Sequence, residues 1–362
     1  MSYPIFDLHW HGRDLKQVHK ETLYRSLMVA EASGIRRLAY MPNTDEPLTT
    51  LERCLDYLKI SDAAGTQVET FVNIGLTPDL EQVKRAVEAT SESARIRAMK
   101  LYMGRSTGDL SIVNKDQQRS VIETLAKEGY DKVLMSHCEK EDKMDDKKYD
   151  PGKPRTWSTI CRPEEAEIES YNDLVEMAEA VNFKGTIHVC HVSTAYVVDF
   201  IHNYQGKLKL SCGITPHHFI LSDMVLASPV GAWYKCNPPL RSEETRVQLE
   251  NRILHGRIPI IESDHAPHTA DDKKGDKPAS GIACGTAWPY VAEYVMNRGM
   301  SESCVRAAVW ENASKLFGLP IEAPEVKVDF DKLKKLQASY PFDHFGGMKE
   351  EFYRLTRAPG LG

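Results

Sequence analysis

Residues 5–11 read Ile-Phe-Asp-Leu-His-Trp-His, so an apolar run ends in two histidines that are one residue apart. Side chains alternate between the two faces of a strand, which places His9 and His11 on the same face. Two imidazoles on one face at a strand end can form half of a metal site. Chance is the alternative, because a chain of 362 residues with 13 histidines can contain such a pair without any function. Further ligands must therefore support the metal site.

Three later segments also place a histidine or an aspartate at the end of an apolar run. His137 follows residues 133–135, His191 closes a strand-like segment, and Asp264 follows residues 258–261. Each of these side chains is expected at the carboxyl end of a strand, just before a loop. This is the edge at which the active site of a (β/α)8 barrel is built.

The whole chain alternates short apolar segments with longer amphipathic segments. The expected strands are residues 4–9, 35–41, 69–75, 97–102, 132–138, 185–192, 207–213 and 258–263. The expected helices lie near residues 19–33, 48–64, 79–93, 116–128, 164–181, 195–204, 243–254 and 286–298. This alternation predicts an α/β fold, a (β/α)8 TIM-type barrel with its active site at the C-terminal ends of the strands. We assign residues 1–319 to the barrel and residues 320–362 to a C-terminal extension that packs on it.

Composition excludes several classes of protein. Hydrophobic residues make up 41% of the chain, which is enough for a large core, and the net charge of −6 argues against a nucleic-acid surface. The N-terminal region has no apolar stretch typical of a signal peptide or a membrane span. The eight cysteines include no Cys-x-x-Cys pair. We therefore expect reduced, mostly buried thiols in a cytoplasmic protein.

Lys100, in the segment Met-Lys-Leu-Tyr of residues 99–102, adds a second kind of ligand. A lysine ammonium would be repelled by divalent cations. A neutral lysine amine can instead react with carbon dioxide to give a carbamate, whose two oxygens can bridge two metals. The alternative is a lysine at the barrel rim that lays its aliphatic stem over apolar surface.

The ordered motifs resemble the dihydroorotase family of the amidohydrolase superfamily, and the resemblance covers nearly the whole barrel. The motifs are D-L-H-W-H-G-R-D at 7–14, M-P-N-T at 41–44, M-K-L-Y at 99–102, S-H-C-E at 136–139, R-P-E-E-A-E at 162–167, H-V-C-H-V at 188–192, T-P-H-H at 215–218, N-P-P-L-R at 237–241, S-D-H-A-P-H-T at 263–269 and N-A-S-K-L-F-G-L at 312–319. The first and ninth motifs are specific in combination.

The resemblance implies two zinc ions per chain. Its ligands would be His9 and His11 on the first metal, His137 and His191 on the second, carboxylated Lys100 and a hydroxide between the two, and Asp264 on the first metal. Asp264 would also be the catalytic general base and acid that handles the proton. Other divalent metals are alternatives to zinc.

The resemblance also implies the substrate contacts. Arg13, Asn43 and His268 would bind a carboxylate, and Asn237 would contact the ring amide. Thr107 falls where some family members place a threonine on a loop that covers the substrate. Arg13 could instead form a surface salt bridge, and Asn43 could be only a turn residue.

Three further residues near these motifs are expected to have structural roles. His217 and His218 exceed the number of ligands needed, so we interpret them as structural or loop-positioning residues. Cys190 precedes His191 in a strand and is expected to face away from the metals and to pack in the core.

The implied activity is the reversible hydrolysis of L-dihydroorotate to N-carbamoyl-L-aspartate in pyrimidine biosynthesis. The alternatives are another cyclic-amide hydrolase, a hydantoinase or an allantoinase, and an inactive scaffold of the same fold. Longer family members carry a β-sandwich domain, which we do not expect here. The expected partner is a small-molecule substrate, without nucleic acid or membrane, and a homo-oligomer stays open.

Overall fold

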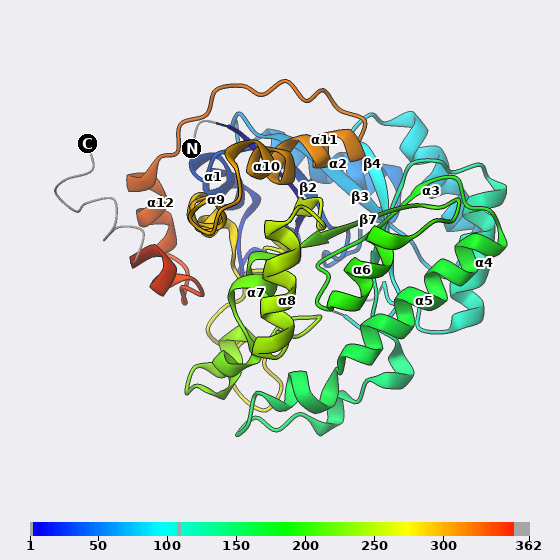
Figure 1. Ribbon diagram of the computed structural model, residues 1–362. Coiled ribbons are helices and arrows are strands. Elements are labelled where there is room, and N and C mark those ends of the chain that lie inside the picture. Colours follow the sequence, from blue (N-terminus) through cyan, green and yellow to red (C-terminus); the bar gives the residue numbers. More distant parts are fainter. Residues whose placement is uncertain (1–2, 107–109, 351–362) are drawn as a thin grey trace.

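The computed structural model describes residues 3–106 and 110–350, and a sheet of eight parallel strands lies at its centre (Figure 1). The strands are β1 (Ile5–Trp10), β2 (Ile35–Tyr40), β3 (Glu69–Gly75), β4 (Ile96–Tyr102), β5 (Val133–His137), β6 (Thr186–Val189), β7 (Lys209–Ile214) and β8 (Ile260–Ile261). Each strand pairs with the next one along the chain. The eight predicted strands are therefore all present.

The last strand returns to the first. The backbone N–H of His11 donates to the carbonyl of His265 at 2.9 Å, and Trp10 and His265 form a parallel bridge. The N–H of Ser263 donates to Oδ1 of Asp7 at 3.1 Å. These contacts bring β8 and β1 together, which confirms the predicted (β/α)8 barrel.

Helices follow the strands and cover the outside of the barrel (Figure 1). The longer ones are α1 (Leu23–Ala32), α2 (Leu51–Asp62), α3 (Leu80–Glu92), α4 (Lys115–Lys127), α5 (Glu164–Ala180), α6 (Ala195–Asn203), α8 (Glu243–Leu254), α9 (Trp288–Asn297) and α12 (Phe330–Gln337). The shorter ones are α7 (Pro216–Ile220), α10 (Glu302–Arg306) and α11 (Asn312–Leu316). Thr50, Asp79 and Asn114 show why the helices begin where they do, because each side chain accepts a hydrogen bond from a backbone N–H of the first turn.

Short helical turns lie in the loops, except η8, which continues the helix between α10 and α11. They are η1 (Leu15–Gln17), η2 (Glu141–Lys143), η3 (Asp146–Lys148), η4 (Trp157–Cys161), η5 (Asp223–Ala227), η6 (Gly231–Tyr234), η7 (Gly285–Ala287) and η8 (Ala307–Glu311). Six of these turns lie in the loops after β5, β7 and β8.

The strands are buried on both faces, since barrel side chains fill the inside and the helices cover the outside. All six residues of β1 are buried, including His9. Of the eight free cysteines, seven are buried and Cys304 is exposed. No helix within the described ranges is long and apolar enough to cross a membrane.

The segment after residue 319 packs on the outside of the barrel, where α12 contacts α1 and lies near α9 (Figure 1). Leu333 of α12 is buried against Ala32 of α1 and Tyr290 of α9. Tyr340 is also buried, and its hydroxyl donates to Glu21. The boundary between residues 1–319 and 320–362 stays a prediction.

Candidate active site

The carboxyl ends of β1 and β8 bring two histidines and an aspartate together. His9 Nε2 and His11 Nε2 lie 3.2 and 2.8 Å from the same oxygen, Oδ1 of Asp264. His11 Nδ1 lies 2.7 Å from Oδ1 of Asn43. Burial lowers the pKa of His11 to about 4, so its ring is neutral and carries one proton between two oxygen neighbours. A neutral imidazole has a single N–H and cannot donate to both oxygens. A cation bound at Nε2 would remove this mismatch, because the proton could then stay on Nδ1 and be donated to Asn43.

Two of the predicted ligands lie on strained backbone. His191 has φ of 40° and Asp264 has φ of 49°, in the left-handed region that side chains with a Cβ seldom adopt. Such a conformation costs about 1–3 kcal/mol and is found most often at functional sites. The backbone therefore turns sharply at both positions, each just beyond the end of a strand.

A second pair of histidines lies across from Asp264. His137 Nδ1 and His191 Nε2 are 3.1 Å apart, and the ring centres of His9 and His191 are 5.0 Å apart. Nε2 of His137 lies 2.9 Å from a carboxylate oxygen of Glu139. This leaves the lone pair of Nδ1 for a ligand. Burial also lowers the pKa values of His137 and His191, which keeps both rings neutral and able to bind a metal.

Lys100 is fully buried at the end of β4. Its Nζ atom donates to Sγ of Cys190 at 2.9 Å, and the described residues include no carboxylate in ion-pair contact with it. An isolated buried ammonium is costly, whereas a neutral amine or its carbamate is not an unpaired cation. This environment supports the predicted bridging role, although no carbamate is part of the structure.

Cys190 was predicted to face away from the site, and this prediction is wrong. Strand β6 ends at Val189, and the chain turns at Cys190 and His191. The alternation of a strand therefore no longer applies, and both side chains reach the barrel interior. Ligand atoms of Cys190, His9 and Glu262 lie within 4.8 Å of one another.

Glu262 is a buried carboxylate that the sequence did not single out. It accepts a hydrogen bond from the backbone N–H of His191, and its Oε2 atom lies 3.5 Å from Nδ1 of His9. Burial opposes its charge, but His9 outweighs this effect and holds the pKa of Glu262 well below its usual value. A Cβ atom at Gly213 would lie 2.6 Å from this carboxylate, so residue 213 must be small. A signal did exist, because Glu262 precedes Asp264 by two residues.

Arg162 and Glu139 support His137 from behind. Arg162 donates to Glu139 at 2.6 Å, and both side chains are buried. Burial would raise the pKa of Glu139, but Arg162 and His137 lower it to about 2. The Glu139 carboxylate is therefore ionised and holds the imidazole of His137 in one orientation.

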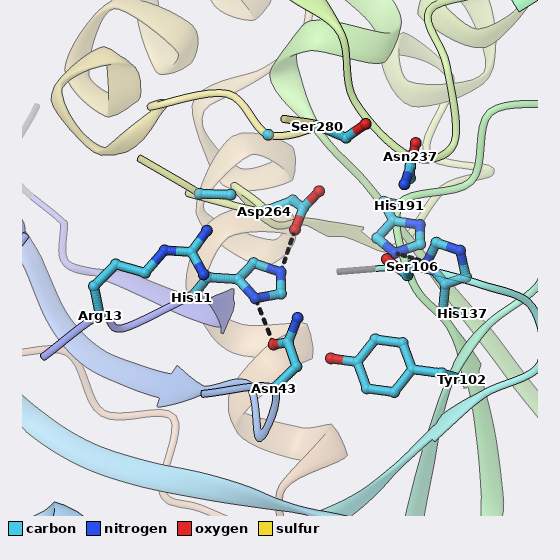
Figure 2. Close-up of a pocket in the computed structure, with 12 residues that line it drawn as sticks. His11, Arg13, Asn43, Tyr102, Ser106, His137, His191, Asn237, Asp264 and Ser280 are labelled. Carbon is cyan, nitrogen blue, oxygen red and sulfur yellow. Dashed lines mark hydrogen bonds and ion pairs between the residues drawn. The ribbon is translucent and has the colours of Figure 1, made fainter. Parts of the chain in front are cut away.

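A pocket opens beside these side chains (Figure 2). It is lined by His11, Arg13, Asn43, Tyr102, Ser106, His137, His191, Asn237, Asp264, Ala266, Ser280 and Gly281. Figure 2 shows Arg13 on one side and His137 with His191 on the other, with Asp264 and His11 between them. The sequence missed Tyr102, Ser106 and Ser280 as lining residues. Tyr102 could have been found, because it lies two residues after Lys100 on the same strand face.

Arg13 is buried in the pocket wall, with only 2% of its surface exposed. Its Nε atom has no hydrogen-bond partner, and no carboxylate of the described ranges lies within ion-pair distance of the guanidinium. Burial lowers its pKa. The alternative of a surface salt bridge is therefore excluded. Glu21, Asp264 and Asp272 lie near enough to act on its charge but do not pair with it directly, so the guanidinium can bind an anionic ligand.

The remaining predicted contacts differ in their placement. Asn237 lines the pocket, and its Oδ1 atom accepts a hydrogen bond from Trp157 Nε1 at 3.2 Å. His268 does not line the pocket; its Nε2 atom lies 3.0 Å from the carbonyl of Ser280, which does. Thr107 lies outside the described residues.

No family model matches the chain. A curated dihydroorotase of Halobacterium salinarum is 30% identical over 321 residues, which cover 87% of this chain and 71% of the relative. A curated dihydroorotase of Aeropyrum pernix is 32% identical over 271 residues, which cover 74% of this chain and 58% of the relative.

Solved structures show the same fold. An L-hydantoinase (dihydropyrimidinase) from Arthrobacter aurescens superposes with a TM-score of 0.78 at 22% identity, over 90% of this chain and 73% of that one. A Saccharomyces cerevisiae dihydroorotase in complex with 5-fluoroorotic acid superposes with a TM-score of 0.71 at 17% identity, over 88% of this chain and 85% of that one. At these identities the likeness establishes the barrel and no more.

Proposed function

Because the chain belongs to the dihydroorotase family, we propose that it is an enzyme that interconverts L-dihydroorotate and N-carbamoyl-L-aspartate. This reaction opens or closes a cyclic amide in pyrimidine biosynthesis. The observation that carries the proposal is the buried guanidinium of Arg13, which lines the pocket and has no carboxylate of the described residues within ion-pair distance. Both members of the substrate pair carry a carboxylate that can supply the missing charge.

We further propose that two zinc ions bind at this pocket. The donor set supports them, because His9, His11 and Asp264 form one group and His137 and His191 form a second. Lys100, as the carbamate, would connect the two groups. When bound, the metals would lower the pKa of water and polarise the amide carbonyl.

Asp264 is the group proposed to move the proton. Its Oδ1 atom lies within 3.2 Å of both His9 and His11, and these rings outweigh the effect of burial and hold the pKa of Asp264 well below its usual value. The carboxylate is therefore ionised, as a proton acceptor must be, and during ring opening it would accept the proton that the attacking water releases. It returns this proton to the ring nitrogen as the amide bond breaks, and ring closure reverses both transfers.

Arg13, Asn43 and Asn237 would hold the substrate. The guanidinium of Arg13 offers two parallel donors to the substrate carboxylate, and Asn43 lies next to it in the wall. Asn237 lies across the pocket and can pair with the ring amide. His268 is also proposed to contact the carboxylate, and its Nε2 atom lies 3.0 Å from the carbonyl of Ser280, a residue of the pocket wall.

The decisive assay compares three substrates on the zinc-loaded protein. We expect ring opening of dihydroorotate and little turnover of hydantoin or allantoin, because neither ring carries a free carboxylate for Arg13. A preference for an uncharged ring would overturn the assignment in favour of a hydantoinase or allantoinase. A protein that binds two metals per chain and opens none of the rings would point to an inactive scaffold.

The cellular setting is also a proposal. Seven buried, unpaired thiols support a reducing, cytoplasmic location. A homo-oligomer stays a prediction that light scattering of the purified chain would test.

A further inference from the structure

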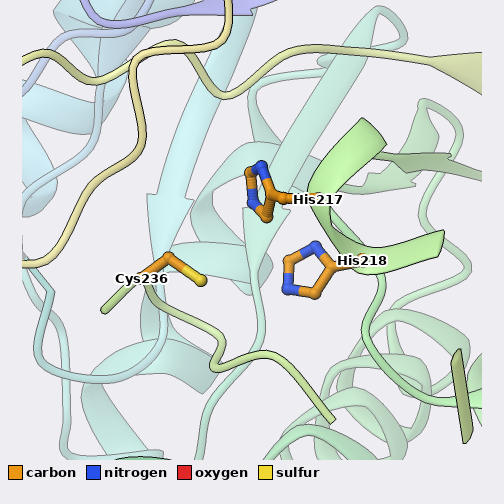
Figure 3. A group of neighbouring side chains, drawn as sticks. All are labelled: His217, His218 and Cys236. Carbon is orange, nitrogen blue, oxygen red and sulfur yellow. The ribbon is translucent and has the colours of Figure 1, made fainter. Parts of the chain in front are cut away.

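A second cluster of ligand side chains lies at the end of β7, outside the pocket described above (Figure 3). His217 and His218 belong to the short helix α7, and Cys236 belongs to the loop that follows η6. Figure 3 shows the Cys236 sulfur directed toward the two imidazoles. One ligand atom from each residue lies within 4.8 Å of the others, and all three side chains are buried.

His217 is the residue that a purely structural role does not explain. Both of its ring nitrogens are buried and have no hydrogen-bond partner in the described part of the chain. A buried polar atom without a partner costs about 1–3 kcal/mol, and nearly all such atoms in proteins are satisfied. Burial holds the pKa of His217 well below its usual value, so the ring is neutral and offers a lone pair. A metal ion bound to this lone pair would give one of the two nitrogens a partner.

His218 is already oriented as metal-binding histidines are. Its Nδ1 atom lies 2.7 Å from the Thr215 hydroxyl, and its Nε2 atom lies 3.1 Å from the carbonyl of Pro238. A histidine that binds a metal through one nitrogen usually holds a fixed partner at the other nitrogen. Thr215 fills that place.

The carbonyl oxygen of Pro238 contacts both Cys236 and His218. The Sγ atom of Cys236 lies 3.2 Å from this oxygen. Two imidazole nitrogens, one sulfur and one carbonyl oxygen therefore surround a common region. A tetrahedral set that mixes nitrogen and sulfur ligands is typical of Zn²⁺.

We propose that His217, His218 and Cys236 bind one Zn²⁺ ion, with the Pro238 carbonyl as the nearest fourth donor. The Cys236 thiol loses its proton to solvent as the Zn–S bond forms. The proton of the His218 ring moves to Nδ1 and is donated to Thr215, which frees Nε2 for the metal. The net reaction takes up one cation and releases one proton.

The site would join two segments of the barrel mouth. Helix α7 follows directly on β7, and Cys236 precedes Asn237 in the pocket wall. A cation held between them would fix the start of the 236–241 segment relative to the sheet. The metal is structural in this position, and its binding does not depend on the proposed substrate.

Cobalt spectroscopy and metal counting on the full chain test the proposal. The protein is stripped with a chelator, titrated with Co²⁺ and examined for a thiolate-to-cobalt charge-transfer band, and bound zinc is counted in parallel. Cys236→Ser should abolish the band and remove one metal equivalent per chain, and His217→Gln should remove the same equivalent. Cys190→Ser is the comparison for the band, because Cys190 is the other cysteine in a possible metal-ligating group of the described residues. Cys54→Ser, which is buried outside these groups, is the matched control for the metal count.

Two results would overturn the site. One is an unchanged metal count in both Cys236→Ser and His217→Gln. The other is a charge-transfer band that disappears in Cys190→Ser and persists in Cys236→Ser. If Cys236→Ser does not fold, His217→Gln decides by metal count alone. A negative dihydroorotate assay would not change the cobalt band or the metal count. The proposed zinc site and the proposed activity are therefore tested independently.

Discussion

The Nζ atom of Lys100 lies 2.9 Å from Sγ of Cys190, and both side chains are buried in the barrel interior. A thiol is a weak acceptor and carries no charge, so it does not compensate a buried ammonium. Carboxylation would turn Lys100 into an anion on the strand next to His137. Cys190 was predicted to face away from the site, but its position beside Lys100 leaves the lysine next to an uncharged group, which supports the proposed carbamate.

Replacement of Lys100 tests the bridge. Lys100→Ala should lose metal and ring-opening activity together, because the two metals would no longer share a ligand. Short carboxylic acids added in excess should restore part of both. Metal content and turnover are measured on the same sample, with the exposed Lys127→Ala as control. A Lys100→Ala protein that keeps two tightly bound metals and normal turnover would rule out the bridge.

Arg13→Met tests charge recognition. Loss of the guanidinium should cost about 2–5 kcal/mol of transition-state stabilisation toward dihydroorotate, the range for truncating one partner of a buried charge pair. Metal content should not change, because Arg13 is not a proposed ligand. Arg13→Lys should recover only part of kcat/KM, since it keeps the charge and loses the fork. Arg85→Met, at an exposed position of α3, is the control, and a loss of only a few-fold in Arg13→Met would contradict the assignment.

Glu139→Gln tests the support behind His137. Breaking the buried pair with Arg162 should destabilise the fold by about 3–5 kcal/mol at neutral pH. The folded pKa of Glu139, about 2, is below its ordinary value of 4.5, so its contribution is complete above pH 4.5 and is lost as the pH falls toward 2.

The dependence of the free energy of unfolding on pH, measured on the acid side, shows the contribution of Glu139. Urea midpoints measured between those two pH values should fall less steeply for Glu139→Gln than for the parent chain. Glu52→Gln, at an exposed position, should follow the parent. Identical slopes for Glu139→Gln and the parent would show that the pair does not set the acid stability.

Leu333→Ala tests whether the segment after residue 319 belongs to the folded unit. Leu333 is buried against Tyr290 and Ala32, so its truncation should cost about 2–5 kcal/mol and lower Tm. Turnover measured well below Tm should stay near the parent value, because α12 is remote from the pocket residues. Lys334→Ala, exposed on the same helix, is the matched control. Equal Tm values for the two variants would mean that α12 does not stabilise the barrel.

The barrel itself could be predicted from sequence because its signals are local. Apolar runs at regular spacing predicted all eight strands, and β4 was misplaced by one residue only, at its start. The clustering of His9, His11, His137, His191 and Asp264 could be predicted, because side chains at the carboxyl ends of parallel strands meet at one edge, and the structure places them close together. Their role as metal ligands stays a prediction.

The positions of Cys190, Glu262, His268 and Ser280 depend on the turns and loops that follow the strands. The turn after Val189 redirects Cys190, and the loop after β8 places Ser280 between His268 and the pocket. The Glu262 carboxylate fits into the barrel interior only because Gly213, on the neighbouring strand β7, has no side chain. None of these contacts follows from the spacing of residues along one strand.

Asp264 has two proposed tasks that pH separates. As a proton acceptor it must be ionised for ring opening, so the rate of opening should rise with pH and then level off. Ring closure needs the protonated carboxyl to help expel water, so its rate should fall over the same interval. The apparent pKa would belong to the unit of Asp264 with His9, His11 and the bound metals, because these groups titrate together.

Asp264→Asn completes the test of the proton transfer. The amide keeps one oxygen for a metal but cannot accept the proton, so activity should collapse in both directions while metal is lost only in part. Initial rates of opening and closure are measured on the variant and on the parent chain across the same pH range, with bound metal counted at each end of it. Parallel pH profiles for opening and closure in the parent would contradict a single group acting in opposite protonation states. An active Asp264→Asn enzyme would assign the proton transfer to another residue.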